Sequence, residues 1–263
     1  MPRFRRPRLL APALLLPLAG CAASGRVALG PLVADRPDFT ESSTTVARGF
    51  VQLESGTTYT EDGASKSASL GEVLVRVGVA SRAELRLGVN SYAIARDGGS
   101  TVRGFEDASV GAKVKLLQGG GAGSARPTVA ILVGTSIPTG ASPLRSTLLQ
   151  PRVKTAWSWV FTDRLSLASN LNYSWIHEPR HDYGQAAAST SFAVGLSGHV
   201  GSFVEYFACF PQQDGLDRSQ YASSGLTLVL NDDLQLDARA GRPLRHSGNG
   251  HSFFVGVGLS RRF

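Results

Sequence analysis

The chain has 263 residues and a formal net charge of +7, with 30 glycines and a single methionine. This length suits one large domain, and so much glycine excludes a mainly helical protein, because glycine weakens helices. The first twenty residues hold four arginines and no acidic residue, and the rest of the chain has 23 basic against 20 acidic residues. That balance is too even for a protein that binds nucleic acid.

Residues 1–20 have the pattern of an export signal peptide. A basic stretch ends at Arg8, and the apolar stretch from Leu9 to Leu18 that follows it is too short to span a bilayer as a helix. Leu18, Ala19, Gly20 and Cys21 together resemble a bacterial lipobox, which makes Cys21 a candidate lipid attachment site. The alternative is ordinary cleavage nearby, with Cys21 incidental.

Residues 21–48 contain no long periodic stretch, and we expect them to form an N-terminal periplasmic segment or a plug. From residue 49 to residue 263 apolar and polar residues alternate. In residues 83–90, for example, alanine, leucine and valine alternate with Glu84, Arg86, Gly88 and Asn90. A period of two predicts β-strands, each with one apolar and one polar face.

Three features favour a membrane barrel over a soluble sandwich. The alternating segments have mostly ten to fourteen residues, which is the length of tilted membrane-spanning strands. Short breaks alternate with longer ones, as periplasmic turns alternate with outer loops. The chain ends on Phe263 with apolar residues in register behind it, which resembles the terminal strand that the bacterial barrel-assembly machinery binds.

The sequence therefore predicts an all-β fold, a closed antiparallel transmembrane β-barrel of about twelve strands preceded by a short periplasmic segment. Closure is expected because an open sheet edge cannot be satisfied in hydrocarbon. We expect a monomer in contact with lipid in the outer membrane of a Gram-negative bacterium. The predicted strands are residues 50–60, 70–80, 82–94, 106–117, 127–138, 148–161, 163–176, 188–200, 202–211, 219–231, 233–242 and 252–263.

Charged residues of both signs fall on the faces expected to line the lumen. They could brace a narrow barrel by ion pairs, or give a pore its solute preference. The mixture of signs argues against a strong filter for anions or cations. The lumen-lining candidates are Glu54, Glu72, Arg76, Glu84, Arg86, Asp107, Lys113, Lys115, Arg152, Lys154, Glu205, Asp237 and Arg239.

Enzymatic alternatives have weaker support. His246, Ser247, Asn249 and His251 include the residue types that an outer-membrane phospholipase uses. They crowd one predicted outer loop, however, where glycine, asparagine and serine are ordinary turn residues. No catalytic residue, cofactor or metal site is therefore assigned.

The string from Ala34 to Ser42 and the charges that follow it resemble a known family. With Glu72, Arg76, Glu84 and Arg86, the string is similar to the meta-pathway phenol-degradation proteins, whose members are often called transporters. The resemblance covers most of the chain after residue 34. The motif residues are Asp35, Arg36, Pro37, Asp38, Thr40 and Glu41.

This resemblance implies an outer-membrane barrel, with some members associated with the catabolism of aromatic compounds. We therefore expect a channel or transporter for passive uptake or binding of small aromatic or hydrophobic molecules. Two alternatives remain open, a plugged structural barrel without transport and an outer-membrane lipase or phospholipase. The segment from Asp35 to Glu41 is expected either to dock on the inner wall or to form a solvated turn.

Overall fold

The protein is described by a computed structural model over residues 29–177, 182–244 and 252–263. These residues form fourteen strands, and among them there is no helix long and apolar enough to cross a membrane. The strands are β1 (Val51–Asp62), β2 (Ser65–Ala80), β3 (Ala83–Val89), β4 (Tyr92–Asp97), β5 (Ser100–Phe105), β6 (Ala108–Leu117), β7 (Thr128–Ile137), β8 (Gln150–Val160), β9 (Leu165–His177), β10 (Asp182–Gly195), β11 (Val200–Pro211), β12 (Ser219–Asn231), β13 (Leu234–Pro243) and β14 (Ser252–Arg262).

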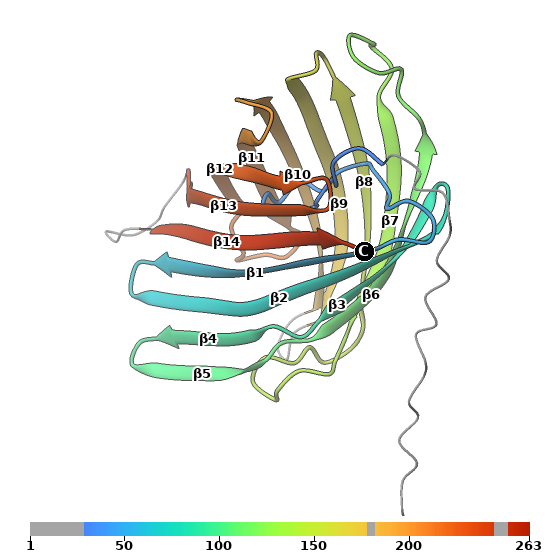
Figure 1. Ribbon diagram of the computed structural model, residues 1–263. Helices are drawn as coiled ribbons and strands as arrows, with labels where there is room; N and C mark the ends of the chain where they lie inside the picture. The colour runs from blue at the N-terminus through green and yellow to red at the C-terminus, as the bar shows by residue number, and fades with distance from the viewer. Residues whose placement is uncertain (1–28, 178–181, 245–251) are drawn as a thin grey trace, which may run out of the picture.

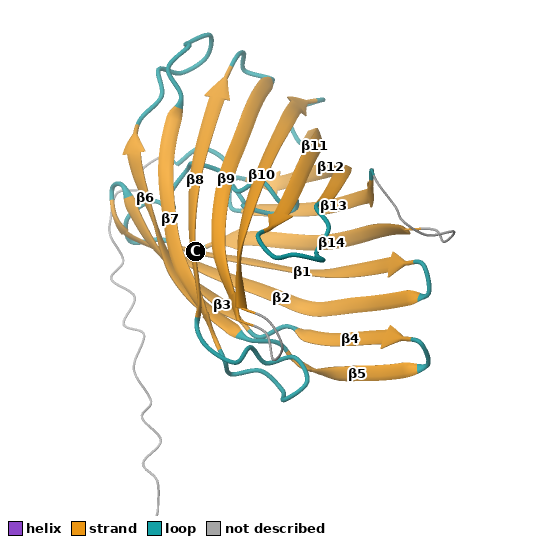
Figure 2. Ribbon diagram, turned by 180° about the vertical axis from the view of Figure 1, so that it is seen from behind, coloured by secondary structure: helices purple, strands orange, loops and turns teal. Residues whose placement is uncertain are grey.

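The strands close into a barrel of twelve antiparallel strands, as predicted. β4 continues β3 and β5 leads into β6, each across a break of two residues, so four assigned strands make two strands of the wall. β1 pairs with both β2 and β14, which closes the ring. That seam runs from Gln52 opposite Arg262 to Asp62 opposite Ser252. Figures 1 and 2 show the ring from opposite sides.

Strand boundaries differ most from the prediction at β10. The sequence predicts a strand at 188–200, whereas β10 spans Asp182–Gly195 and the turn lies at residues 196–199. The first half of β10 has a glycine, a glutamine and three consecutive alanines after Asp182 and Tyr183, and these residues give no regular contrast between an apolar and a polar face. β5 was likewise predicted as part of a loop, because its residues lack regular alternation.

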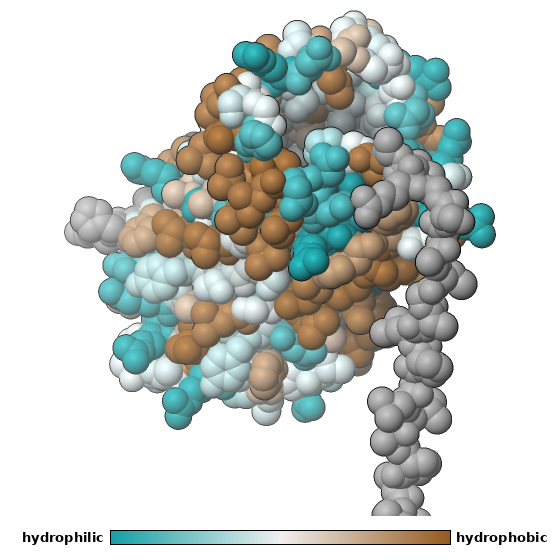
Figure 3. Space-filling model, in the orientation of Figure 1, coloured by the Kyte–Doolittle hydropathy of each residue, from teal (hydrophilic) through white to brown (hydrophobic). Residues whose placement is uncertain are grey.

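The outer surface of the wall is apolar. Leu85, Leu87 and Val89 are 54%, 46% and 45% exposed on β3, and exposed large apolar residues continue on the other strands, which is far more than the scattered ones of a soluble protein. Broad apolar areas cover the strands in Figure 3, and hydrophilic residues gather toward the loops. A closed barrel with this exterior is suited to hydrocarbon, since pairing around the ring leaves few backbone groups unpaired toward lipid.

The wall is interrupted beside β5. One edge of β5 pairs with β4, and within the described residues no strand pairs with its other edge. β7 ends at Ile137, opposite Ala108, so a loop of residues 138–149 borders β5 instead. The amide of Ala141 in this loop donates to the carbonyl of Phe105 at 2.7 Å. The strand ladder is therefore continuous around the periplasmic half and broken near the outer rim.

Candidate functional site

The N-terminal segment, defined here as residues 29–50, runs across the inside of the barrel (Figure 1). Its side chains and amides bond to residues on strands all round the ring. The amide of Asp35 donates to Glu54 on β1, that of Glu41 to Asn170 on β9 at 2.7 Å, and that of Val46 to Glu84 on β3 at 2.7 Å. Such contacts on opposite walls hold the segment across the lumen.

A buried ion-pair network on the wall holds this segment at Val33 and at Thr44. The Arg76 side chain is fully buried, as are those of Glu54 and Glu84. Its guanidinium lies 2.7 Å from Glu54 and 2.9 Å from Glu84, and it also donates to the carbonyls of Val33 and Thr44. Charges taken out of water need partners of this kind, because an unpaired buried charge is strongly destabilising.

Asp35 is the carboxylate at which the segment and the wall charges meet. It accepts Lys113 at 2.8 Å and Arg86 at 2.6 Å, and Arg76 is 3.4 Å away. Burial alone would raise the pKa of Asp35, but the charges of Arg76, Lys113 and Arg86 outweigh it and hold that pKa well below its usual range.

Glu41 is held in the same way further along the segment. Arg86 and Lys154 each lie 2.7 Å from its carboxylate. Burial raises the pKa of Glu41, and the charges of Lys154 and Arg86 overcome that effect and lower it to about 2. Asp35 and Glu41 are thus both ionised anchors at neutral pH.

Glu205 on β11 holds the middle of the segment without a cation among its hydrogen-bond partners. Its carboxylate accepts the amides of Phe39 and Thr40, at 3.1 and 2.7 Å, and the hydroxyls of Thr40 and Ser223. Asp38 is a second acidic group here. Burial, followed by the repulsion of Glu205, raises the pKa of Asp38 to about 7.

Arg36 reaches the seam between β1 and β14. Its guanidinium lies 2.8 Å from Glu72 and 3.6 Å from the buried carboxylate of Asp237. It sits directly against Gly56 and Gly258, where any side chain would collide with it. The wall therefore has glycine where the segment's arginine approaches the backbone.

The structure places the other predicted lumen charges at different points of the interior. Arg239 lies over the ring of Phe254, with its guanidinium 5.4 Å from the ring centre. Lys115 follows Lys113 toward the periplasmic end of β6. Asp107 lies between β5 and β6 and accepts the amides of Gly140 and Ser146 from the loop beside the gap. These three residues therefore lie outside the ion pairs around Asp35.

A group of aromatic side chains lies inside the barrel, and none of them is among the residues that the sequence predicts to line the lumen. Phe39 of the segment stacks on Phe207 of β11, and Phe207 stacks on Tyr221 of β12, both with ring centres 4.7 Å apart. Phe254 of β14 lies 6.2 Å from Phe207. The sequence could have indicated this position for Phe207, because it lies two residues after Glu205 and therefore on the same lumen-facing side of the strand.

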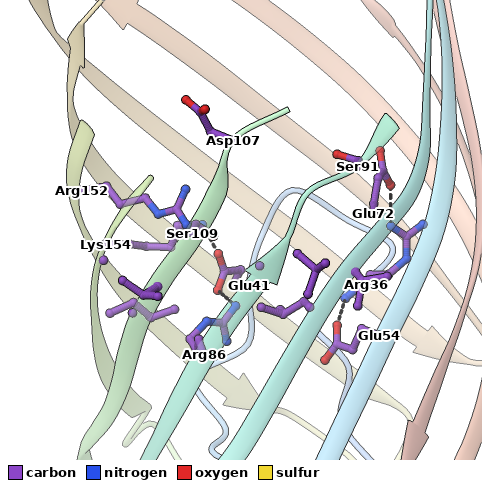
Figure 4. Close-up of a pocket in the computed structure, with 18 of the residues that line it drawn as sticks. Arg36, Glu41, Glu54, Glu72, Arg86, Ser91, Asp107, Ser109, Arg152 and Lys154 are labelled. Atoms are coloured by element: carbon purple, nitrogen blue, oxygen red, sulfur yellow. Dashed lines mark hydrogen bonds and ion pairs between the residues drawn. The ribbon is translucent and has the colours of Figure 1, made fainter. Parts of the chain in front are cut away.

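Two cavities lie on either side of the N-terminal segment. One of about 390 Å³ occupies the outer half of the lumen between the segment and β2, β3, β6, β7 and β8. The other, of about 430 Å³, opens at the periplasmic end beside residues 160–166 and 193–195. Figure 4 shows Arg86, Arg152 and Lys154 around the outer cavity. The segment thus separates two spaces within one lumen.

A third cavity adjoins the outer one at the gap in the wall. It has a volume of about 560 Å³ and is bordered by Glu106, Ser136 and the loop residues 143–146. Ser91 and Asp107 line both this space and the outer lumen cavity. The outer lumen cavity is therefore bordered by this third cavity at the gap in the wall beside β5.

Several sequence predictions lie outside the described residues. Cys21, the signal peptide at 1–20 and the loop residues 246–251 proposed for a lipase are among them. Within the described ranges, no three or more histidine, cysteine or acidic side chains are grouped so that they could hold a metal ion.

The chain is similar in fold to outer-membrane proteins of known structure. The COG4313 outer membrane channel from Pseudomonas putida F1 aligns over 88% of this chain and 100% of its own, with a TM-score of 0.65 and 14% identity. The NanC porin aligns over 80% and 98%, with a TM-score of 0.56 and 10% identity. The KdgM porin in complex with disordered oligogalacturonate aligns over 81% and 99%, with a TM-score of 0.50 and 11% identity.

None of the curated proteins matches the chain. Its closed barrel, its apolar exterior and its likeness in fold to outer-membrane channels and porins place it in the outer membrane of a Gram-negative bacterium. Residues 34–263 match the family described as "Putative MetA-pathway of phenol degradation". The resemblance to this family is thereby confirmed, and the chain, an outer-membrane β-barrel, belongs to that family.

Proposed function

We propose that this barrel serves the passive uptake or binding of small aromatic or hydrophobic molecules, and that it is not an enzyme. The observation that carries the proposal is the aromatic group on the inner wall. Phe207 is sandwiched between Phe39 and Tyr221. Tyr221 is half-exposed inside the lumen and is stacked by Phe207 on one face, so a ring-bearing solute can stack on its other face.

The cavities support the same proposal. The outer lumen cavity, of about 390 Å³, falls within the usual range of small-molecule sites. The gap beside β5 adjoins this cavity, and a solute that dissolves in lipid could use it without passing the N-terminal segment. Lys154 lines the cavity and also lies over the ring of Phe39, 5.6 Å from its centre, so the charged and aromatic walls meet at that point.

The experiment measures binding of a neutral aromatic probe, 4-fluorobenzamide, to the purified full chain in detergent by fluorine NMR, with empty micelles as the blank. We expect saturable binding with a dissociation constant on the order of 0.1–1 mM for a ligand of this size. Tyr221→Ala should weaken binding by roughly threefold to tenfold, because a stacked aromatic pair contributes about 0.5–1.5 kcal/mol.

Tyr206→Ala is the matched control, because Tyr206 lies on the neighbouring strand and is exposed on the outer face. It should leave the dissociation constant unchanged. The plugged structural barrel predicts no saturable binding by the wild type, and no openings in planar bilayers. Lipase activity that is lost in Ser247→Ala and His246→Ala would favour the enzymatic alternative instead.

A further inference from the structure

The outer lumen cavity owes its space to glycine on the inner wall. Gly88 of β3, Gly111 of β6 and Gly134 of β7 all border it. Gly111 and Gly134 face each other across the strand pair, and a side chain on either would meet backbone atoms of the other strand. The wall is therefore bare here, so side chains reach the cavity mainly from its rim.

The carboxylates that border this cavity already have partners. Glu41 is paired with Arg86 and Lys154, Glu72 with Arg36, and Glu54 with Arg76. Asp107 accepts the amides of Gly140 and Ser146 and the hydroxyl of Ser146. None of these acidic groups is left to pair with a further cation.

Of the four cations that border this cavity, Arg36, Arg86 and Lys154 are paired with carboxylates, and Arg152 on β8 is not. Within the described ranges of the chain it forms no hydrogen bond or ion pair, and it is exposed rather than buried. Its guanidinium points into the cavity on the side of Ser109 (Figure 4). It lies opposite Gly134 in the β7–β8 pairing, so the glycine leaves the space in front of it open.

A guanidinium presents a planar fork of donors that matches a carboxylate. Two apolar side chains border the same cavity, Leu74 from β2 and Leu132 from β7, and Leu132 lies opposite Lys154 on the lumen face. The cavity therefore combines one available cation with an apolar border, which suits a molecule that has an anionic group on an apolar body.

We propose that the outer lumen cavity binds amphipathic organic anions of the aromatic carboxylate class, with Arg152 holding the carboxylate and Leu74 and Leu132 bordering the ring. This inference rests on the proposed function and gives its solute a contact region apart from Tyr221, which does not border this cavity. Arg86 and Lys154, which are already paired with Glu41, form the cationic surroundings rather than the contact.

The test compares 4-fluorobenzoate with its neutral isostere 4-fluorobenzamide on the full chain in detergent by fluorine NMR. We expect the wild type to bind the carboxylate about tenfold more tightly, as a charged hydrogen bond would give. Arg152→Gln should reduce this preference to about onefold, and Arg152→Lys should keep part of it, since the charge stays but the fork is lost.

Arg126→Gln is the matched control, because Arg126 is an exposed arginine in the turn between β6 and β7. It should keep the full preference for the carboxylate. Folding of each variant is checked by heat-modifiable migration on gels. Acetate at the same concentration should not displace 4-fluorobenzoate, and complete displacement would overturn the apolar half of the site.

The outcomes separate the two proposals. Binding of the amide without any preference for the carboxylate overturns the Arg152 site and leaves the proposed function standing. If folded Arg152→Gln keeps the full preference for the carboxylate, the Arg152 site is likewise overturned and the proposed function still stands. If the wild type binds neither probe, both proposals fail.

Discussion

Asp38 is the residue whose charge state is expected to govern how firmly the N-terminal segment docks. Burial and the nearby charge of Glu205 raise its pKa to about 7. A carboxyl group whose pKa is higher in the docked than in the solvated state favours docking at low pH. That advantage is lost as the pH rises from the ordinary value near 3.8 to about 7. Glu41, with a pKa of about 2, stays ionised over this range.

We therefore predict that ion conductance in planar bilayers rises between about pH 4 and pH 7 and levels off above pH 7, because the segment undocks more often. One coupled proton limits the change to about tenfold per pH unit. Asp38→Asn should give a low conductance that is independent of pH in this range. Asp214→Asn, in an exposed outer loop, serves as the control, and an Asp38→Asn profile identical to that of the wild type would rule out this role.

At the scale of elements, β2 and the end of the N-terminal segment fit together through one glycine. A side chain at Gly78 would run into the backbone carbonyls of Val46 and Ala47. Close by, the amide of Gly49 donates to the carbonyl of Gly78 at 2.8 Å. Neither partner can move aside easily, because both are backbone.

Gly78→Ala is accordingly expected to lower the free energy of unfolding by roughly 1–3 kcal/mol, the usual cost of overpacking. Urea titration of the refolded barrel measures this. Gly198→Ala is the control, since no atom lies within 4 Å of its added carbon, and it should change stability by less than about 0.5 kcal/mol. Equal effects of the two substitutions would show that the segment does not rest on Gly78.

At the scale of the whole molecule, closure of the barrel depends on backbone rather than on the terminal side chain. The amide of Phe263 donates to the carbonyl of Val51 at 2.8 Å, and the amide of Val51 donates back at 3.2 Å. The ring of Phe263 is 60% exposed. Its side chain is thus accessible, and binding of this residue by the barrel-assembly machinery stays a prediction from the sequence.

We predict that Phe263→Ser changes the unfolding free energy of the refolded protein by less than about 0.5 kcal/mol, yet lowers the folded fraction in the outer membrane of cells. Heat-modifiable migration measures both quantities. Phe253→Ser alters an exposed aromatic residue at the other end of β14. If it reduces assembly in cells as much as Phe263→Ser does, the terminal residue has no special part in assembly.

The alternation of residues by itself determined the wall of this protein. Period two puts Leu85 and Leu87 on one face and Glu84 and Arg86 on the other, whatever surrounds them, so lipid and lumen faces follow from local geometry. Closure then follows because hydrocarbon leaves no unpaired edge. Where alternation was weak, as in β5 and the first half of β10, the predicted boundaries were wrong.

Only the tertiary structure decided what the inward residues contact. Thr40 meets Glu205 across a sequence separation of 165 residues, and Phe39 stacks on Phe207, because closing the ring brings distant strands round one segment. The same closure gives Arg76 three acidic neighbours and leaves Arg152 facing open space. Local spacing fixes the side of the wall on which a residue lies, whereas its partner depends on how the whole ring closes around the N-terminal segment.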